Sequence, residues 1–279
     1  MDLERSCLNE IIRLALAEDR CEADVTTSAL LAFDGPARAE VRAKAAGVIS
    51  GTGVFAETMR TVDPDLRIAV VKADGRPVFP GDLVLEIFGR ESSILKGERA
   101  ALNFMQRLSG IATLTREYVE KLTPYRAVLL DTRKTTPGMR YLEKQAVRDG
   151  GGCNHRLNLE AMAMVKDNHI EMAGGIAPAV AALRGAFPEK TIEVEVKNLR
   201  ECQEALDLGV EMIMLDNFPL DQAGRAVALN RGRAKLEISG NVTLANIAEK
   251  AATGVDFISV GALTHSFQSL DLSLEIMRS

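Results

Sequence analysis

The second half of the chain repeats one pattern, in which a short apolar run ends in polar residues or glycine and an amphipathic segment follows. The apolar runs end at Leu130, Val165, Val194, Leu215, Ile238 and Val260. The segments with helical spacing are Met139–Arg148, Ala177–Ala186, Leu199–Leu208, Leu220–Leu229 and Thr243–Thr253. Strands that alternate with helices are typical of parallel sheets, whose right-handed crossovers close naturally into a barrel. The pattern therefore predicts an α/β barrel.

The first part of the chain has a different organisation, with strand-like segments between helical ones. Helical spacing of apolar residues predicts helices over Leu8–Leu16 and Val54–Thr61, and a long helix over Ser92–Leu122. Strands are expected at Ala37–Ser50, Leu66–Lys72 and Asp82–Phe88. Gly110 lies within the long helix, where it either kinks the helix or lets another backbone approach.

The composition of the chain limits the classes of protein to which it can belong. With 279 residues and 47% hydrophobic content, the chain suits a compact globular protein of one large domain or two. A net charge of -5 and few aromatic residues argue against a nucleic-acid binder. The four cysteines form no C-x-x-C pair, so no zinc cluster or redox motif is indicated. No signal core or membrane span is present in the sequence, and we expect a soluble cytoplasmic protein.

Charged side chains follow the predicted strands of the barrel. Active sites of such barrels lie at the carboxyl ends of the strands, which meet at one mouth. Each residue alone has an ordinary explanation as a cap or surface charge, but six polar strand ends together favour a shared site. The residues expected to converge there are Asp131, Arg133, Lys134, Lys166, Glu195 and Asp216.

The mouth combines many cations with two acids. Arginine holds carboxylates and phosphates through two parallel hydrogen bonds, so a polyanionic ligand is expected. Glu195 and Asp216 would repel an anion unless they bind sugar hydroxyls or Mg²⁺, which usually sits between carboxylates and substrate phosphates. A phosphosugar with a divalent ion fits both halves of the pattern. The cations are Arg133, Lys134, Arg156 and Lys166, with His155 as a possible fifth donor.

Two glycine-containing loops follow the last two strands. They are Ser239-Gly240-Asn241 and Gly261-Ala262, and each approaches the start of a helical segment. In α/β barrels, late loops and a nearby helix N-terminus often bind phosphate through backbone N–H groups. Glycine allows the backbone to come close to the ligand. These loops are candidates for a phosphate site.

Several motifs together resemble the quinolinate phosphoribosyltransferase family, and they occur in one order between about Glu98 and Ser266. The motifs are G-E-R-A-A-L-N-F-M-Q-R-L-S-G-I-A-T, D-T-R-K-T-T-P-G-M-R, G-G-G-C-N-H-R, V-K-D-N-H, E-V-E-V, L-D-N-F, S-G-N-V and S-V-G-A-L-T-H-S. The N-terminal third is compatible with the same family.

The resemblance implies a reaction and an architecture. Quinolinate and phosphoribosyl pyrophosphate would give nicotinate mononucleotide, pyrophosphate and CO₂, with Mg²⁺, in NAD biosynthesis. An N-terminal α/β sandwich domain over residues 1–110, joined by a returning tail of residues 267–279, would precede an incomplete TIM-like α/β barrel of about six strands over residues 111–266. The resemblance also implies a homodimer or a higher homo-oligomer in which Arg99 reaches the neighbouring active site.

Site roles follow from the same resemblance. Lys134 and Lys166 would line the junction between quinolinate and the phosphoribosyl group, and Glu195 and Asp216 would hold the ribose hydroxyls and Mg²⁺; these four are the catalytic candidates. The residues expected to bind the quinolinate carboxylates are Arg99 of the neighbour, Arg133, His155 and Arg156. The residues expected to cradle the 5′-phosphate are Ser239, Gly240, Asn241, Gly261 and Ala262.

Two other interpretations remain open on sequence grounds. The first is a relative with the same fold, either a molybdenum-transport protein or a nicotinate-specific transferase. The pair Arg133 and Arg156 favours a dicarboxylate, because nicotinate needs fewer cations. The second is a non-catalytic barrel that senses an anionic metabolite. Retention of Glu195 and Asp216 speaks against it, because a plain anion binder gains nothing from acids in its pocket.

Overall fold

The protein forms two compact units in a computed structural model that describes residues 3–277, with side chains from Cys7 onward. Residues 1, 2, 278 and 279 of the expected domains lie outside this range. The first unit contains the chain up to Arg116, the segment 135–151 and the residues from Ser266. The second unit contains Glu117–Lys134 and Gly152–His265.

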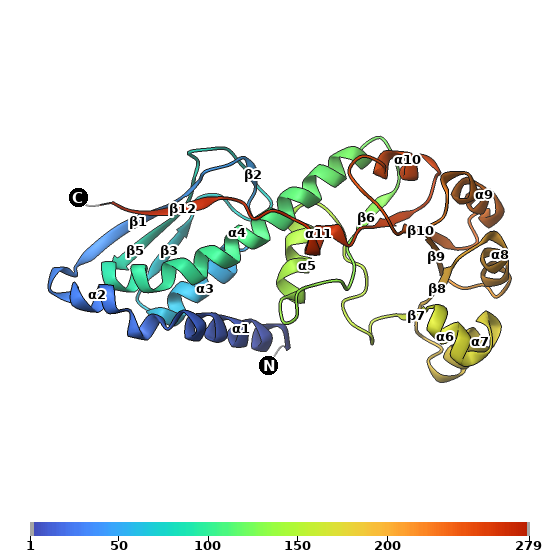
Figure 1. Ribbon diagram of the computed structural model, residues 1–279, viewed down its shortest axis with the longest axis horizontal. Coiled ribbons are helices and arrows are strands. Elements are labelled where there is room, and N and C mark those ends of the chain that lie inside the picture. The colour runs from blue at the N-terminus through green and yellow to red at the C-terminus, as the bar shows by residue number, and fades with distance from the viewer. Residues whose placement is uncertain (1–2, 278–279) are drawn as a thin grey trace. The chain divides into compact units, whose positions relative to one another are not determined.

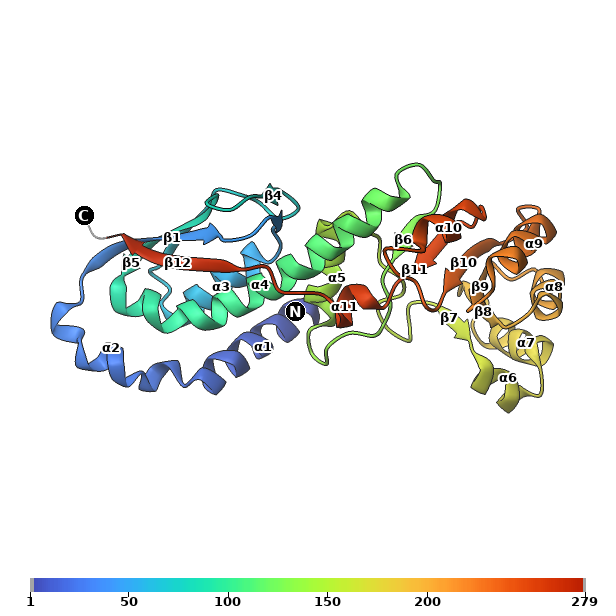
Figure 2. The same ribbon diagram turned by 45° about the horizontal axis from the view of Figure 1, so that its top comes forward.

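The first unit is built on an antiparallel sheet in the order β12-β1-β5-β3. Its strands are β1 (Pro36–Ala43), β3 (Arg67–Val70), β5 (Leu83–Arg90) and β12 (Leu272–Met277), and Figures 1 and 2 show β1 and β12 side by side. The strand expected at Ala37–Ser50 is divided, because Gly47–Val48 forms a separate strand, β2, that pairs with β4 (Pro77–Val78). The other two expected strands are present with shifted ends.

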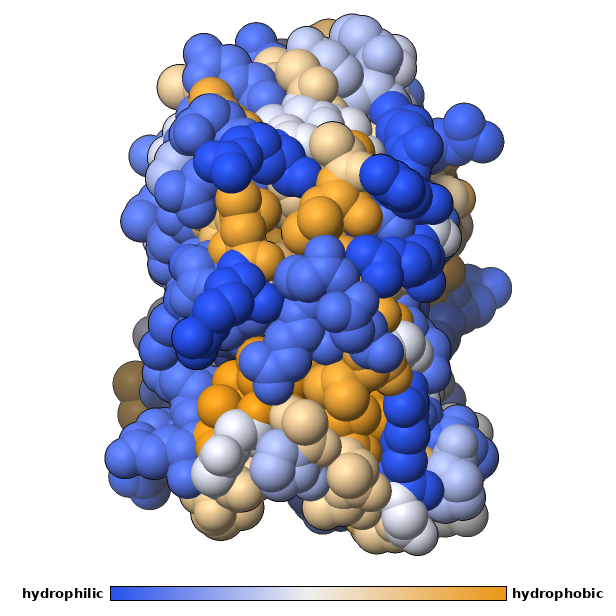
Figure 3. Space-filling model, turned by 90° about the vertical axis from the view of Figure 1, so that its right-hand side faces the viewer, coloured by the Kyte–Doolittle hydropathy of each residue, from blue (hydrophilic) through white to orange (hydrophobic). Residues whose placement is uncertain are grey.

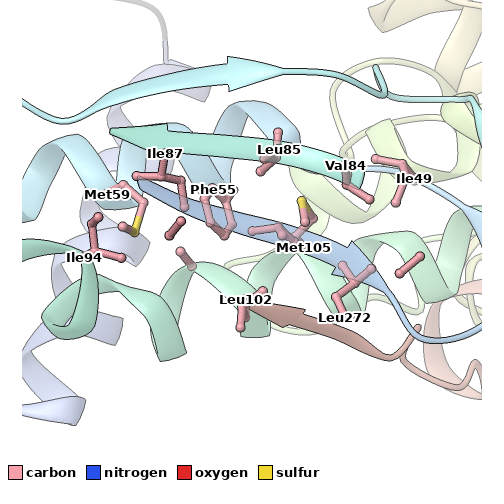
Figure 4. Close-up of a cluster of buried hydrophobic side chains, with 14 of the residues drawn as sticks. Ile49, Phe55, Met59, Val84, Leu85, Ile87, Ile94, Leu102, Met105 and Leu272 are labelled. Atoms are coloured by element: carbon pink, nitrogen blue, oxygen red, sulfur yellow. The ribbon is translucent and has the colours of Figure 1, made fainter. Parts of the chain in front are cut away.

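Helices pack on this sheet and enclose its hydrophobic core. Phe55 of α3 (Thr52–Val62) and Met105 of α4 (Glu91–Leu122) face Leu85 and Ile87 of β5 in the core shown in Figure 4. All four side chains are wholly buried. The remaining helices of this unit are α1 (Leu3–Asp19), α2 (Val25–Ala29) and α5 (Arg140–Asp149), with 3-10 turns at Cys21–Ala23 and Leu31–Phe33. The three helices expected before residue 123 are therefore confirmed.

Gly110 allows two backbone segments to pack closely and does not kink α4. Helix α4 continues through it to Leu122. A Cβ atom at Gly110 would overlap the backbone carbonyl of Gln268, in the segment that leads to β12. The glycine therefore lets another backbone approach, which was one of the two expectations for this position.

The segment 135–151 was expected within the barrel domain, yet it groups with the first unit. Arg107 of α4 explains this grouping, because its Nη2 lies 2.6 Å from Oε1 of the wholly buried Glu143 in α5. The other carboxylate oxygen of Glu143 accepts the backbone N–H of Thr136 at 3.1 Å. A buried charge is stable only when paired, so this contact holds the segment against α4.

The second unit contains a parallel sheet of six strands in the order β6-β11-β10-β9-β8-β7. Strands β6 and β7 occupy the two edges and do not pair with each other, so the described barrel is incomplete. Each strand ends within two residues of its expected end. The strands are β6 (Val128–Leu130), β7 (Ala163–Val165), β8 (Ile192–Val196), β9 (Met212–Asp216), β10 (Lys235–Ser239) and β11 (Phe257–Ser259).

Helices follow the strands of this unit and cover one side of the sheet. In Figures 1 and 2, α7 (Ile176–Ala186), α8 (Leu199–Asp207) and α9 (Leu220–Asn230) lie outside β8, β9 and β10. Hydrophilic residues predominate on this outer face, with hydrophobic patches between them (Figure 3). Helix α10 (Ile247–Ala252) is shorter than expected, and α6 (Asp167–Ala173) and the single turn α11 (Ala262–His265) are additional.

The described helices include none that is both long and apolar enough to cross a membrane.

Candidate active site

A pocket of about 820 Å³ lies at the carboxyl ends of the parallel strands in the second unit. It brings together nearly all residues expected at the site, although they come from six strands and their loops. Only Arg99 is elsewhere among the expected site residues, on α4 of the first unit, where its side chain is 60% exposed. The expected residues that line the pocket are Asp131, Arg133, Lys134, His155, Arg156, Lys166, Glu195, Asp216, Ser239, Gly240, Asn241, Gly261 and Ala262.

Lys166 and Glu195 form an ion pair in this pocket, with Nζ 2.7 Å from Oε2. Lys166 is the N-cap of α6, and its backbone N–H donates to Nδ1 of His169 at 3.1 Å. His169 therefore holds the backbone of Lys166 at the start of α6. The ion pair places one positive and one negative group at the ends of the adjacent strands β7 and β8.

Asp131 is wholly buried and supports the loop after β6. Its Oδ1 accepts the backbone N–H of His155 at 2.8 Å, and its Oδ2 accepts the side-chain amide of Asn154 at 2.6 Å. The carboxylate thereby fixes the segment that carries His155 and Arg156. Lys134 is held in a similar way, because its carbonyl accepts the hydroxyl of Thr264 at 2.8 Å.

His155 contacts two buried acids, which come from strands on either side of β9. Its Nε2 lies 3.0 Å from Oε2 of Glu193 on β8 and 3.4 Å from Oε2 of Glu237 on β10. Burial alone lowers the pKa of His155, but the hydrogen bonds and charges of the two carboxylates outweigh it and raise that pKa to about 9. Burial raises the pKa of the Glu193 carboxyl. His155 and Glu193 together therefore hold an additional proton at neutral pH.

Arg156 lies close enough to Arg133 for their charges to repel. Burial, followed by the positive charge of Arg133, lowers the pKa of the Arg156 guanidinium. Its Nη1 donates to the carbonyl of Met162 at 3.0 Å. Two neighbouring guanidinium groups in one pocket favour an anionic ligand, since an anion relieves their repulsion.

Asparagine side chains connect Asp216 to the loop after β10. The amide of Asn217 donates to Oδ1 of Asp216 at 3.0 Å, and the amide of Asn241 donates to Oδ1 of Asn217 at 2.9 Å. Gly240 has φ of 91° and Asn241 has φ of 49°, so both adopt left-handed backbone conformations. A Cβ atom at Gly240 would overlap the side chain of Asn217. Glycine is required at this turn by both backbone conformation and space.

Glu195 and Asp216 fit a magnesium ion better than the buried cluster does. Mg²⁺ prefers oxygen ligands and retains waters or phosphate oxygens in its coordination shell. Both acids end adjacent strands and line the large pocket. The ligand atoms of His155, Glu193 and Glu237 also lie within 4.8 Å of one another. However, that cluster includes a nitrogen atom, and its two carboxyl groups are wholly buried, which leaves little room for water.

Sequence reasoning missed Glu193, Glu237 and Asn217. Glu193 precedes Glu195 by two residues, and Glu237 precedes Ser239 by two. Because strand side chains alternate between faces, residues two apart share a face. The motif E-V-E-V therefore contained a signal for a second acid on the inner face of the barrel.

Comparison with known proteins identifies the relatives of this chain. A model described as the N-terminal domain of quinolinate phosphoribosyl transferase matches residues 24–109, and its C-terminal counterpart matches residues 111–275. A protein of Synechocystis sp., named a probable nicotinate-nucleotide pyrophosphorylase (carboxylating), is 47% identical over 95% of this chain and 90% of its own. A Bacillus subtilis protein of the same name is 39% identical over 98% and 94%. The solved structure of the nicotinate-nucleotide pyrophosphorylase from Francisella tularensis has a TM-score of 0.95 at 39% identity, covering 99% of this chain and 98% of that one.

Proposed function

Because the chain belongs to the quinolinate phosphoribosyltransferase family, we propose that it transfers a phosphoribosyl group from phosphoribosyl pyrophosphate to quinolinate. The products are nicotinate mononucleotide, pyrophosphate and CO₂, a reaction of NAD biosynthesis. The observation that carries this proposal is one pocket lined by two guanidinium groups, two lysines and four carboxyl groups, among them those of Glu195 and Asp216. The carboxylates and phosphates of a dicarboxylate and a phosphosugar would pair with the cations, and the sugar hydroxyls would bind the carboxylates.

The pocket divides between the two substrates according to charge. Arg133 and Arg156 bind the carboxylates of quinolinate, and Lys134 and Lys166 lie at the junction where the new bond forms. Glu195 and Asp216 take the ribose hydroxyls. The loops that bind the 5′-phosphate through backbone N–H groups are Ser239-Gly240-Asn241 and Gly261-Ala262.

Glu195 and Asp216 would also hold Mg²⁺, which when bound neutralises negative charge on the pyrophosphate group. The chain's own residues position the reactants and stabilise charge. As pyrophosphate leaves C1 of the ribose, the two carboxylates favour the positive charge that develops there. The pyridine nitrogen attacks C1 and becomes a pyridinium. The adjacent carboxylate then leaves as CO₂, its bonding electrons remain on the ring carbon, and that carbon takes up a proton.

The role proposed for Arg99 requires a homodimer. It lies in the first unit with a largely exposed side chain, and its nearest ionic contact is Glu98 at 3.7 Å. An exposed arginine with a weak local ion pair is suited to a ligand or to a second subunit. In a dimer, Arg99 of one subunit completes the quinolinate site of the other. A cytoplasmic location stays a prediction.

One assay tests the proposed activity. The protein is incubated with Mg²⁺, phosphoribosyl pyrophosphate and quinolinate, and CO₂ and nicotinate mononucleotide are measured. Nicotinate replaces quinolinate in a parallel reaction, and Asp216→Asn serves as the inactive control. Product from quinolinate that exceeds product from nicotinate by about 10²-fold or more supports the proposal. Equal turnover of nicotinate indicates a nicotinate-specific enzyme, and binding without product indicates a sensor.

A further inference from the structure

Several polar contacts connect His155 to its neighbours within the second unit. Its backbone N–H donates to Asp131 Oδ1 at 2.8 Å. Its ring Nε2 lies 3.0 Å from Glu193 Oε2 and 3.4 Å from Glu237 Oε2. Its ring Nδ1 accepts the backbone N–H of Arg156 at 2.8 Å. The ring is nearly buried, with 6% of its side chain exposed.

These contacts determine what the ring offers to a ligand. A ring nitrogen that accepts an amide hydrogen carries no proton, so Nδ1 cannot donate to a substrate carboxylate. The Nε2 proton is directed at Glu193, its hydrogen-bond partner, and Glu237 lies 3.4 Å away. The additional proton of the cluster therefore lies on the Nε2 side, among the carboxyl oxygens.

On the premise of the proposed function, we propose that His155 is a positioning residue, which connects the buried carboxylates of Glu193 and Glu237 to Arg156. Arg156 binds the quinolinate carboxylate, and His155 does not touch it. This assignment replaces the direct role that the resemblance implied for His155. It also gives a role to two buried acids that the proposed mechanism does not use.

Arg156 is held at both ends by this arrangement. Its backbone N–H is bonded to the ring of His155, and its Nη1 is bonded to the carbonyl of Met162 at 3.0 Å. The negative charge of Glu193 also acts on the guanidinium. Glu193 is wholly buried, so it affects a ligand in the pocket only through residues such as His155 and Arg156. A guanidinium that is pre-positioned loses less entropy when it binds a carboxylate.

A double-mutant cycle distinguishes positioning from direct binding. The dissociation constant of quinolinate is measured by calorimetry for the wild type, His155→Ala, Arg156→Ala and the double variant. Each single variant should weaken binding by about tenfold or more. Because His155 acts through Arg156, the double variant should bind within about threefold of Arg156→Ala. Penalties that multiply in the double variant would show that His155 contacts quinolinate itself, which overturns the proposal.

A matched pair at Glu193 separates positioning from general damage. Glu193→Met removes the acceptor for Nε2, whereas Glu193→Gln keeps an acceptor oxygen at similar size. The methionine variant should raise KM for quinolinate by about tenfold and leave KM for phosphoribosyl pyrophosphate within about threefold. The glutamine variant should restore quinolinate binding. An equal rise in both KM values, or no rescue by glutamine, contradicts a positioning role.

A measurement made without substrate tests the role of His155 independently of the proposed activity. Nitrogen NMR of the labelled wild type reports whether each ring nitrogen of the three histidines carries a proton. The signal lost in His155→Ala identifies this ring. An unprotonated Nδ1 at neutral pH is expected, and a protonated Nδ1 overturns the proposal even if quinolinate binds. Failure of the wild type to bind quinolinate rejects the proposed function alone.

Discussion

Lys166 Nζ lies 2.7 Å from Oε2 of Glu195, and the ion pair joins the ends of β7 and β8 in the candidate active site. In this state each residue neutralises the other, with Lys166 44% exposed and Glu195 13% exposed. On the proposed function, the phosphates and ribose hydroxyls of the substrates would compete for both partners and would replace this ion pair on binding.

Replacing Lys166 by methionine should lower kcat/KM by about 10²-fold, because the site loses one cation and leaves Glu195 without its partner. Steady-state kinetics with both substrates measure this effect. Lys197→Met is the matched control, since Lys197 Nζ forms a 3.4 Å ion pair with the exposed Asp167 outside the pocket. The control should change kcat/KM by no more than about twofold. Unchanged kinetics in Lys166→Met would remove Lys166 from the proposed site.

Arg99→Ala should impair quinolinate binding without unfolding the protein, because the side chain is exposed and weakly paired. Complementation tests the shared site. When inactive Arg99→Ala is mixed with inactive Lys134→Ala and subunits exchange, activity should recover to about a quarter of the wild type. Half of the dimers are then mixed, and each carries one intact site. No recovery in verified mixed dimers counts against a shared site, and Arg67→Ala, another exposed arginine of the first unit, should stay active alone.

Gly240→Ala should raise KM for phosphoribosyl pyrophosphate by about tenfold or more, while quinolinate binding changes little. The added methyl group would overlap Asn217 and shift the loop expected to bind phosphate. Gly232→Ala is the control, because Gly232 also has a positive φ, of 78°, but its Cβ would meet no atom within 4 Å. That variant should cost about 1 kcal/mol of stability and leave both KM values unchanged. An equal KM effect in both variants would refute a phosphate role for the loop.

Stability should fall as pH rises through the range in which the hydrogen-bonded pair of His155 and Glu193 loses its additional proton. The pKa of His155, raised from 6.5 to about 9, describes the titration of this pair, so its contribution is complete below about pH 6.5 and is lost as pH rises through about 9. The folded protein holds this proton more tightly than the unfolded chain does, and the loss should amount to at most about 3 kcal/mol. The raised pKa of Glu193 acts in the same direction. Urea unfolding at several pH values measures the effect, which should shrink in His155→Gln; an equal slope in that variant would contradict this assignment.

Gly110→Ala should destabilise the first unit by about 3 kcal/mol or more, because its methyl group would overlap the carbonyl of Gln268 and push two backbones apart. The matched control is Gly224→Ala in α9, where a Cβ would meet no atom within 4 Å. Alanine should stabilise that helix by up to about 1 kcal/mol. Thermal unfolding of both variants measures the difference, and a similar melting temperature for the two would reject the close approach at Gly110.

Local patterns predicted much of the second unit. The ends of its six strands and most of its helices follow from the alternation of apolar runs and amphipathic segments, which reflects short-range geometry. The segment 135–151 shows the limit of this reasoning. Its helix α5 was expected, but its membership of the first unit depends on the contact between Arg107 and Glu143, which are 36 residues apart.

The sequence by itself determined the kinds of element, their order and the polar residues at the strand ends, because periodicity and chain order are properties of neighbouring residues. Only the tertiary structure decided which side chains meet. Glu193 lies 38 residues from His155 in the chain and belongs to strand β8, yet it contacts the ring of His155, which lies in a loop. Sheet order and register brought Glu237 to the same ring from β10. Long-range pairing sets these contacts, and through them it decides which charged groups surround the proposed substrate site.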